Sequence, residues 1–304
     1  MKVATQNGTA PAQAPPRVSA LQRVTKGRLA RPQRVLVYGA EGVGKSTFAS
    51  GAPKPIFLGA EGGTLYLDVA RLPEPRTWDE ALDALRDVRR EPHDYETIVV
   101  DPLNWLQPLN WEKVCAGAGV SIEQACGGFG KGYVAALDLW RVLVAELGAI
   151  WSERSMHVVL LAHAALGRVE NTVGLSYNQW RPALHASDKA NAAGLFAQWV
   201  DHVLYVAVET HATRGADDRV IGVSTGRRVA HAAPSGGWVA KGRMLPAELE
   251  LSWAAFYEAA TRGQEVESLL ERVDAETRER ARGFLRAGAD VGEVLSKLKE
   301  KVQK

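Results

Sequence analysis

The stretch RVLVYGAEGVGKSTFAS, residues 34–50, decides the fold of this chain. It opens with an apolar run that predicts a buried strand, and residues 39–46 then match the pattern G-x-x-x-x-G-K-S. Such a loop binds phosphate because the strand leads a glycine-rich turn into a helix whose free N–H groups face the anion. Lys45 then reaches the β- and γ-phosphates, and the Ser46 hydroxyl holds Mg²⁺. We therefore predict a site for ATP and Mg²⁺ formed by Gly39, Ala40, Glu41, Gly42, Val43, Gly44, Lys45, Ser46 and Thr47.

Composition excludes several other classes of protein. The chain has 304 residues, of which 46% are hydrophobic and 24% charged, as is typical of a globular protein with a substantial core. It contains no apolar run of about 18 residues, so we expect no membrane span. The N-terminus lacks the apolar stretch of a secretory signal. Cys115 and Cys126 belong to no CxxC motif, which indicates a reducing compartment and favours a cytoplasmic location.

The charge is unevenly distributed, although the net charge is only +2. Residues 1–33 contain no acidic residue and are rich in Ala, Pro and Gln, a composition typical of a disordered arm. Such a basic arm either contacts nucleic acid or a neighbouring subunit, or serves only as a solubilising tail. Its cations are Lys2, Arg17, Arg23, Lys26, Arg28 and Arg31.

From residue 34 onward, short apolar segments alternate with longer helical ones, which predicts an α/β fold with a mostly parallel twisted sheet flanked by helices. The expected strands are 34–39, 55–60, 97–101, 157–163, 202–208 and 219–225, with a late strand pair at 229–244. The expected helices are 77–91, 134–153 and 246–261, the last starting at Pro246. We expect an ATPase core over 34–261 and a charged, helical C-terminal appendage over 262–304.

Three polar residues follow expected strands, at the edge where open α/β sheets bind ligands. Glu61 can orient and deprotonate the attacking water, or is only a helix N-cap or surface acid. Asp101 closes the run TIVV, the Walker B pattern in which an Asp holds Mg²⁺ through water. His163 ends the run HVVLLA and can sense the γ-phosphate, although a lone histidine is more often structural.

Two cations follow the glycine-rich turn PSGG late in the core. Lys241 and Arg243 are two residues apart, so on a strand they point to the same side. Such a pair suits a finger that neutralises transition-state charge on a neighbouring subunit's nucleotide. The alternative is a solvated strand edge protected by charge.

The ordered set of motifs resembles a RecA-type ATPase core. More specifically, it resembles the phage-encoded, RecA-like AAA proteins of the Sak type, proposed to be single-strand annealing ATPases. The resemblance covers about residues 30–260 and rests on GAEGVGKSTFA, FLGAEGG, TIVVDPLNWL, FGKGY, LLAH and AKGR. It implies that Glu61 is the catalytic glutamate and that His163 stands where RecA proteins carry a glutamine. It also implies that Lys241 and Arg243 reach an adjacent subunit's ATP, so the protein forms a ring or filament.

RecA-like cores bind DNA through two loops, which the resemblance places within 108–133 and 164–190. Aromatic residues interleaved with cations suit single strands, because bases stack on the rings and phosphates meet the cations. The alternative is that the aromatic residues pack the loops against the core. The candidate DNA-binding residues are Phe129, Lys131, Tyr133, Arg168, Tyr177, Trp180, Arg181 and Lys189.

The leading hypothesis is an ATP-dependent, single-stranded-DNA-binding protein of phage-type recombination that acts in the bacterial host cytoplasm. It would promote strand annealing or exchange, with a single-strand-binding protein as a further partner. A helicase-like translocation motor shares the same core and the same K-x-R finger. A regulatory P-loop ATPase that does not bind DNA is a third hypothesis, because strong DNA binders are often more basic than this chain.

Overall fold

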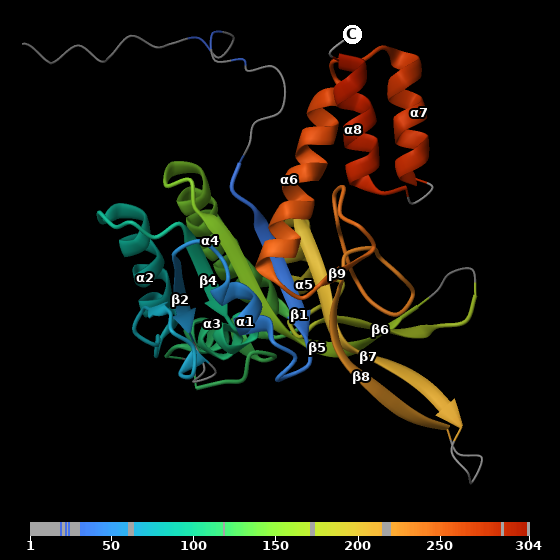
Figure 1. Ribbon diagram of the computed structural model, residues 1–304. Coiled ribbons are helices and arrows are strands. Elements are labelled where there is room, and N and C mark those ends of the chain that lie inside the picture. The colour runs from blue at the N-terminus through green and yellow to red at the C-terminus, as the bar shows by residue number, and fades with distance from the viewer. Residues whose placement is uncertain are drawn as a thin grey trace, which may run out of the picture.

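The computed structural model describes residues 19, 22, 24, 31–59, 64–117, 119–170, 174–214, 220–286 and 289–302. A mostly parallel β-sheet forms the centre and is flanked by helices on both faces (Figure 1). A further group of helices at the C-terminal end stands beside the sheet. The fold class expected from the sequence is confirmed. Residues 1–33, expected to form a basic arm, lie almost entirely outside the described part of the chain.

Within the described residues the sheet has nine strands. They are β1 (Arg34–Gly39), β2 (Pro55–Gly59), β3 (Ala70–Arg71), β4 (Thr97–Asp101), β5 (His157–Val169), β6 (Tyr177–Pro182), β7 (His202–Arg214), β8 (Val220–His231) and β9 (Glu248–Glu250). The central strands run parallel in the order β2-β4-β5-β1-β7, and β3 continues this pairing at one edge. β8, β9 and β6 are antiparallel to their neighbours. Because parallel strands end at one edge, the ends of β1, β4 and β5 meet there.

Helices bury both faces of this sheet. One face carries α2 (Trp78–Arg90), α3 (Leu106–Cys115), α4 (Lys131–Glu153) and α5 (Ala192–Trp199), and the other carries α1 (Lys45–Ser50) and α6 (Trp253–Leu270). Alternate residues of β1 serve the two sides: Leu36 and Tyr38 pack in the first cluster, Val35 and Val37 in the second. Burial on both sides explains why this strand is a continuous apolar run.

Two antiparallel hairpins extend beyond the parallel part of the sheet (Figure 1). The strand expected at 219–225 is the first part of β8, but the hairpin pairing itself was not predicted from the sequence. The strand expected at 157–163 continues to Val169 and pairs with β6, and the strand expected at 202–208 continues to Arg214 and pairs with β8. The described residues of these extensions are nearly all exposed or half-buried, so they lack the apolar run that marks a buried strand. The expected strand pair at 229–244 is wrong: residues 229–231 end β8, and the remainder makes only isolated bridges at Trp238 and Lys241.

The C-terminal region is helical, as expected, but its first helix starts later. α6 begins at Trp253 rather than Pro246, because β9 occupies residues 248–250 and the Ser252 side chain caps the helix by accepting from the Ala255 N–H. The helix runs without interruption through residue 262, where we expected the appendage to begin. Its last turns pack with α7 (Ala275–Arg286) and α8 (Val291–Val302) around a separate apolar cluster. Among the described residues, no helix is long and apolar enough to cross a membrane.

Candidate nucleotide-binding site

The phosphate loop joins β1 to α1, as the sequence predicted. Gly39 pairs with β7 so closely that a Cβ there would lie 2.2 Å from the Val206 carbonyl oxygen. Gly42 and Gly44 have φ angles of 70° and 104°, in the region that favours glycine. α1 begins directly afterwards at Lys45. The glycines thus allow the tight turn that points backbone N–H groups toward an anion.

Lys45, Ser46 and Asp101 come together at this turn. The Lys45 Nζ donates hydrogen bonds to the carbonyl oxygens of Gly39 at 3.1 Å and Ala40 at 2.8 Å. The Ser46 Oγ donates to the Asp101 Oδ2 at 2.6 Å. Hydroxyl and carboxylate oxygens are ligands that Mg²⁺ prefers, so this pair fits the predicted metal-binding role. When bound there, Mg²⁺ supplies positive charge that offsets the charge of the phosphates.

His163 lies beside the loop, in β5, where the parallel pairing with β1 ends at Gly39. Its Nδ1 is 3.4 Å from the Glu41 Oε1, and its backbone N–H donates to the Asn104 Oδ1 at 2.9 Å. Asn104 belongs to the short 3₁₀ helix η3 (Leu103–Trp105), directly after Asp101 and Pro102. Asn104 lies within the segment TIVVDPLNWL, but the sequence assigned it no role. Glu61, the predicted catalytic glutamate, lies outside the described residues.

The two late cations lie far from this chain's own phosphate loop. The Lys241 Nζ donates to the carbonyl oxygens of Ala197, Gln198 and Val200, at the C-terminal end of α5. Burial, helped by the nearby charge of Arg243, lowers the pKa of the Lys241 amine. Arg243 is exposed and lines a groove with Arg34 at the start of β1. Both cations therefore lie toward the opposite sheet edge, and their reach into another subunit stays a prediction.

The two expected DNA-binding segments contact each other. Phe129 is 88% exposed and has a φ of 54°, and Lys131 is the exposed first residue of α4. The Lys189 Nζ donates to the Phe129 carbonyl oxygen at 3.5 Å. Tyr133 does not present a free ring, because it stacks on His185 with centroids 4.0 Å apart and an interplanar angle of 5°.

The other candidates lie on the hairpin formed by β5 and β6 rather than on a loop. Arg168 is exposed on β5, and Tyr177 and Trp180 are 40% and 38% exposed on β6. Arg181 packs over Gly167, where a Cβ would lie 2.5 Å from its Cζ. The Trp180 ring stacks on Tyr205 at 6.4 Å. The Trp180 side chain thus packs against the protein and is also partly exposed.

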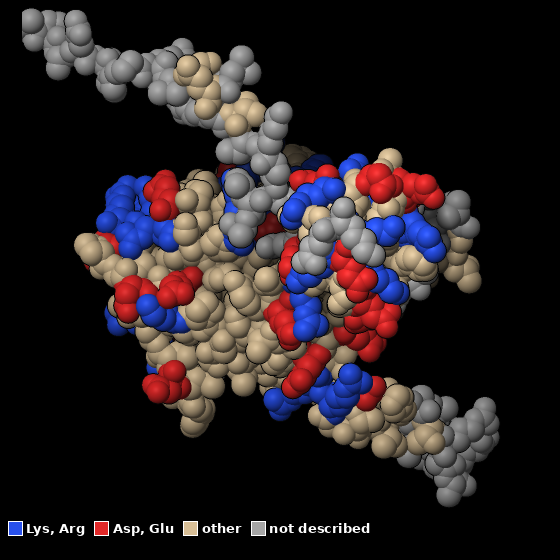
Figure 2. All heavy atoms as spheres, turned by 45° about the horizontal axis from the view of Figure 1, so that its top comes forward, with Lys and Arg blue, Asp and Glu red and all other residues tan. Residues whose placement is uncertain are grey.

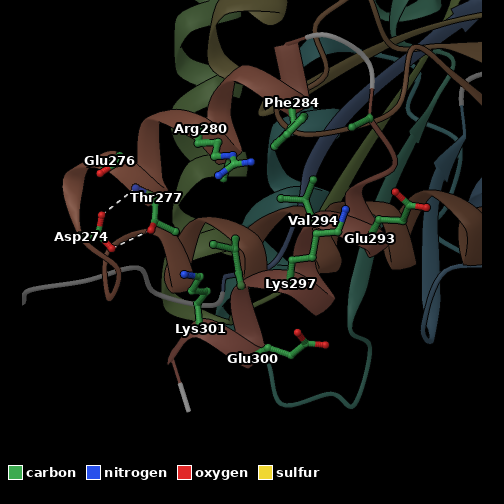
Figure 3. Close-up of a pocket in the computed structure, with 13 residues that line it drawn as sticks. Asp274, Glu276, Thr277, Arg280, Phe284, Glu293, Val294, Lys297, Glu300 and Lys301 are labelled. Carbon is green, nitrogen blue, oxygen red and sulfur yellow. Dashed lines mark hydrogen bonds between the residues drawn. The ribbon is translucent and has the colours of Figure 1, made fainter. Parts of the chain in front are cut away.

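The C-terminal helices carry a separate groove of about 800 Å³ between α7 and α8 (Figure 3). Phe284 and the cations Arg280, Lys297 and Lys301 line it together with several acidic side chains. At one end Asp274 accepts hydrogen bonds from the Thr277 N–H and hydroxyl, each at 2.8 Å. None of the phosphate-loop residues lines this groove, so it is distinct from the nucleotide site.

A parallel sheet with a phosphate loop between its strand and helix, and a serine–aspartate pair beside it, defines a P-loop NTPase. The chain belongs to the AAA domain family, whose profile matches residues 31–244. Among solved structures, the chain is similar to the RadB recombinase, with 14% sequence identity and a TM-score of 0.36. That similarity covers 66% of this chain and 80% of the other. No curated protein sequence matches the chain.

Proposed function

We propose that this P-loop NTPase is an ATPase that binds single-stranded DNA and promotes strand annealing or exchange. The observation that carries the proposal is a series of contacts that connects the phosphate loop to the two expected DNA-binding segments, 108–133 and 164–190. The chain after Asp101 contacts β5 at His163 through Asn104, as described above, and contacts the second segment, 164–190, through Gln107. The Gln107 Oε1 accepts a hydrogen bond from the His185 N–H at 2.7 Å.

Through these contacts, nucleotide binding can change the position of the DNA-binding segments. His185 is itself stacked on Tyr133, which lies in the first turn of α4 beside Phe129 and Lys131. A displacement of the chain after Asp101 therefore moves both segments together. Bound ATP orders them and raises affinity for DNA, and hydrolysis releases it, because a ligand shifts an equilibrium only through differential contacts with its two states.

The roles of the nucleotide-site residues follow their chemistry. Lys45 moves from the loop carbonyls to the β- and γ-phosphates, and Ser46 and Asp101 hold Mg²⁺. Glu61 orients the attacking water, and His163 reports the γ-phosphate to the Asn104 segment. The bound strand stacks bases on Phe129 and Trp180, while Lys131, Arg168 and Lys189 meet phosphates.

The protein acts as a homo-oligomer in this proposal, either a ring or a filament. Arg243 lies toward the sheet edge opposite to the phosphate loop, so an adjacent subunit's ATP is the nucleotide that it serves. The resemblance of the ordered motifs to Sak-type proteins supports this assembly. It also supports a role in phage-type recombination, with a single-strand-binding protein as partner.

ATP turnover with and without single-stranded DNA tests the proposal, together with the particle mass measured in ATP. We expect DNA to stimulate turnover and ATP to favour an oligomer. Phe129→Ala should weaken DNA binding, because stacking on an aromatic side chain contributes about 1–3 kcal/mol per base. Phe284→Ala is the matched control, since Phe284 is exposed on α7, away from both segments. Equal DNA affinity of the two variants would contradict the assignment of Phe129.

The charge distribution favours a second candidate, a regulatory ATPase that binds a protein. The net charge is only +2, and cationic and anionic side chains interleave on the face shown in Figure 2. A salt titration of DNA binding separates the two functions, because phosphate contacts give a steep loss of affinity with salt. A shallow slope with weak affinity would favour the regulatory ATPase.

A further inference from the structure

An arginine that no motif predicts lies against the phosphate loop. Arg228, on β8, places its Nη1 3.0 Å and its Cδ 3.7 Å from where a Cβ on Gly44 would lie. Gly44 directly precedes Lys45 and is the N-cap residue of α1. The Arg228 guanidinium is therefore next to the part of the loop that points its N–H groups at an anion.

The register of the sheet explains this position. Gly39, the last residue of β1, pairs with Val206, and Val206 pairs with Ala230. Ala230 packs in the apolar cluster on the α1 face, so Arg228, two residues away on the same strand, also faces α1. Since β8 runs antiparallel to β7, Arg228 lies beyond the end of β1 and reaches over the loop.

The charge of this side chain is not neutralised by the protein. The Arg228 side chain is exposed and forms no hydrogen bond or ion pair with the residues that the structure describes. Its neighbour Arg227 points to the other face of the hairpin, where its Nη1 lies 3.6 Å from the Glu209 Oε1. An arginine stays charged at all physiological pH values.

We propose that Arg228 contacts the phosphates of the nucleotide bound by its own chain. The planar guanidinium offers paired N–H donors that match phosphate oxygens. Arg228 approaches the loop from β8, on the α1 face, whereas Asp101, which accepts the Ser46 hydroxyl, approaches from the end of β4. The ligand class is a nucleoside di- or triphosphate, and the inference rests on nucleotide binding in the proposed function.

Calorimetric titration of ATP with Mg²⁺ into the full chain and its variants tests this contact. Arg228→Ala should weaken ATP binding about tenfold, the loss typical of a charge-assisted hydrogen bond. Arg228→Gln, which stays polar but loses the charge, should weaken it similarly. Arg227→Ala is the matched control and should bind ATP like the wild type. The difference between Arg228→Ala and wild type should shrink as NaCl is raised, because salt screens an exposed charge.

Three results would overturn the proposal: unchanged ATP affinity in Arg228→Ala, an equal loss in Arg227→Ala, or a loss that salt does not reduce. Thermal unfolding of each variant without nucleotide excludes a fold defect, since this exposed side chain should leave stability unchanged. The same titration of the wild type distinguishes failure of the Arg228 proposal from failure of the proposed nucleotide site. Absent ATP binding there would refute the nucleotide site itself, whereas wild-type binding that Arg228→Ala retains refutes only the role of Arg228.

Discussion

Replacing Tyr38 with phenylalanine should lower the stability of the protein, because it removes hydrogen bonds between β1 and the segments at Trp180 and Val239. Tyr38 is fully buried, one residue before Gly39. Its hydroxyl lies 2.9 Å from the Trp180 carbonyl oxygen and 2.7 Å from that of Val239, and it accepts the Val239 N–H at 3.0 Å. Burial raises the pKa of this phenol above its usual range, so it remains a donor.

The hydroxyl has one proton, so it makes two hydrogen bonds at a time, one donated and one accepted. Tyr38→Phe removes both and deprives the Val239 carbonyl oxygen of its donor, which costs about 1–2 kcal/mol. The Val239 N–H keeps its hydrogen bond to the Trp180 carbonyl oxygen at 3.0 Å. We expect the midpoint of thermal unfolding to fall by roughly 2–4 °C, since the shift per kcal/mol is small for a chain of this size. Circular dichroism measures this midpoint, and urea unfolding gives the free energy directly.

The control is Tyr257→Phe, because Tyr257 is 42% exposed and its hydroxyl has no hydrogen-bond partner among the described residues. This change should alter stability by less than about 0.5 kcal/mol. If Tyr38→Phe unfolds at the same temperature as the wild type or the control, the hydrogen bonds of the Tyr38 hydroxyl to Trp180 and Val239 do not stabilise the fold as described.

Three further predictions concern the nucleotide site and the opposite sheet edge. Asp101→Asn should abolish Mg²⁺-dependent ATP turnover while the fold survives, which a phosphate-release assay and circular dichroism would show together. Burial raises the pKa of Asp201, but the hydrogen bonds and charge of Arg34 outweigh it and hold that pKa below 3.8. The stability that this carboxylate contributes is therefore present above pH 3.8 and lost as pH falls through the depressed value. The stability difference between wild type and Asp201→Asn, measured by urea unfolding, should narrow over that range. Lys241→Ala should lower stability by about 1–2 kcal/mol, because it removes the cation at the C-terminal end of α5, and an unchanged unfolding midpoint would argue against that role.

The sequence predicted the phosphate loop because all its determinants are local. An apolar strand, glycines at positive φ and the Lys45–Ser46 pair occupy one short stretch, and each dictates its own backbone. The parallel sheet could also be predicted, because short apolar segments alternate with helical ones along the sequence. The proximity of Ser46 to Asp101 followed as well, since both lie at the carboxyl edge of that sheet.

Long-range contacts escaped prediction. The i, i+2 spacing of Lys241 and Arg243 does not reveal that the Lys241 amine meets the end of α5, a helix that the sequence reading missed. The Tyr133 ring is suited to stacking on a base, but it stacks instead on His185, which lies in the other expected DNA-binding segment, 164–190. Arg228 reaches Gly44 only through the β7–β8 register, which apolar periodicity could not show on an exposed hairpin.

Single-strand DNA affinity with and without ATP and Mg²⁺, measured for wild type and Lys45→Ala, tests the central claim most directly. The proposed coupling predicts that nucleotide tightens wild-type binding at least about fivefold, the lower end of typical coupling free energies. In Lys45→Ala the two affinities should be equal, because this variant lacks the amine that grips the phosphates. Wild-type affinity that is the same with and without nucleotide would contradict the account.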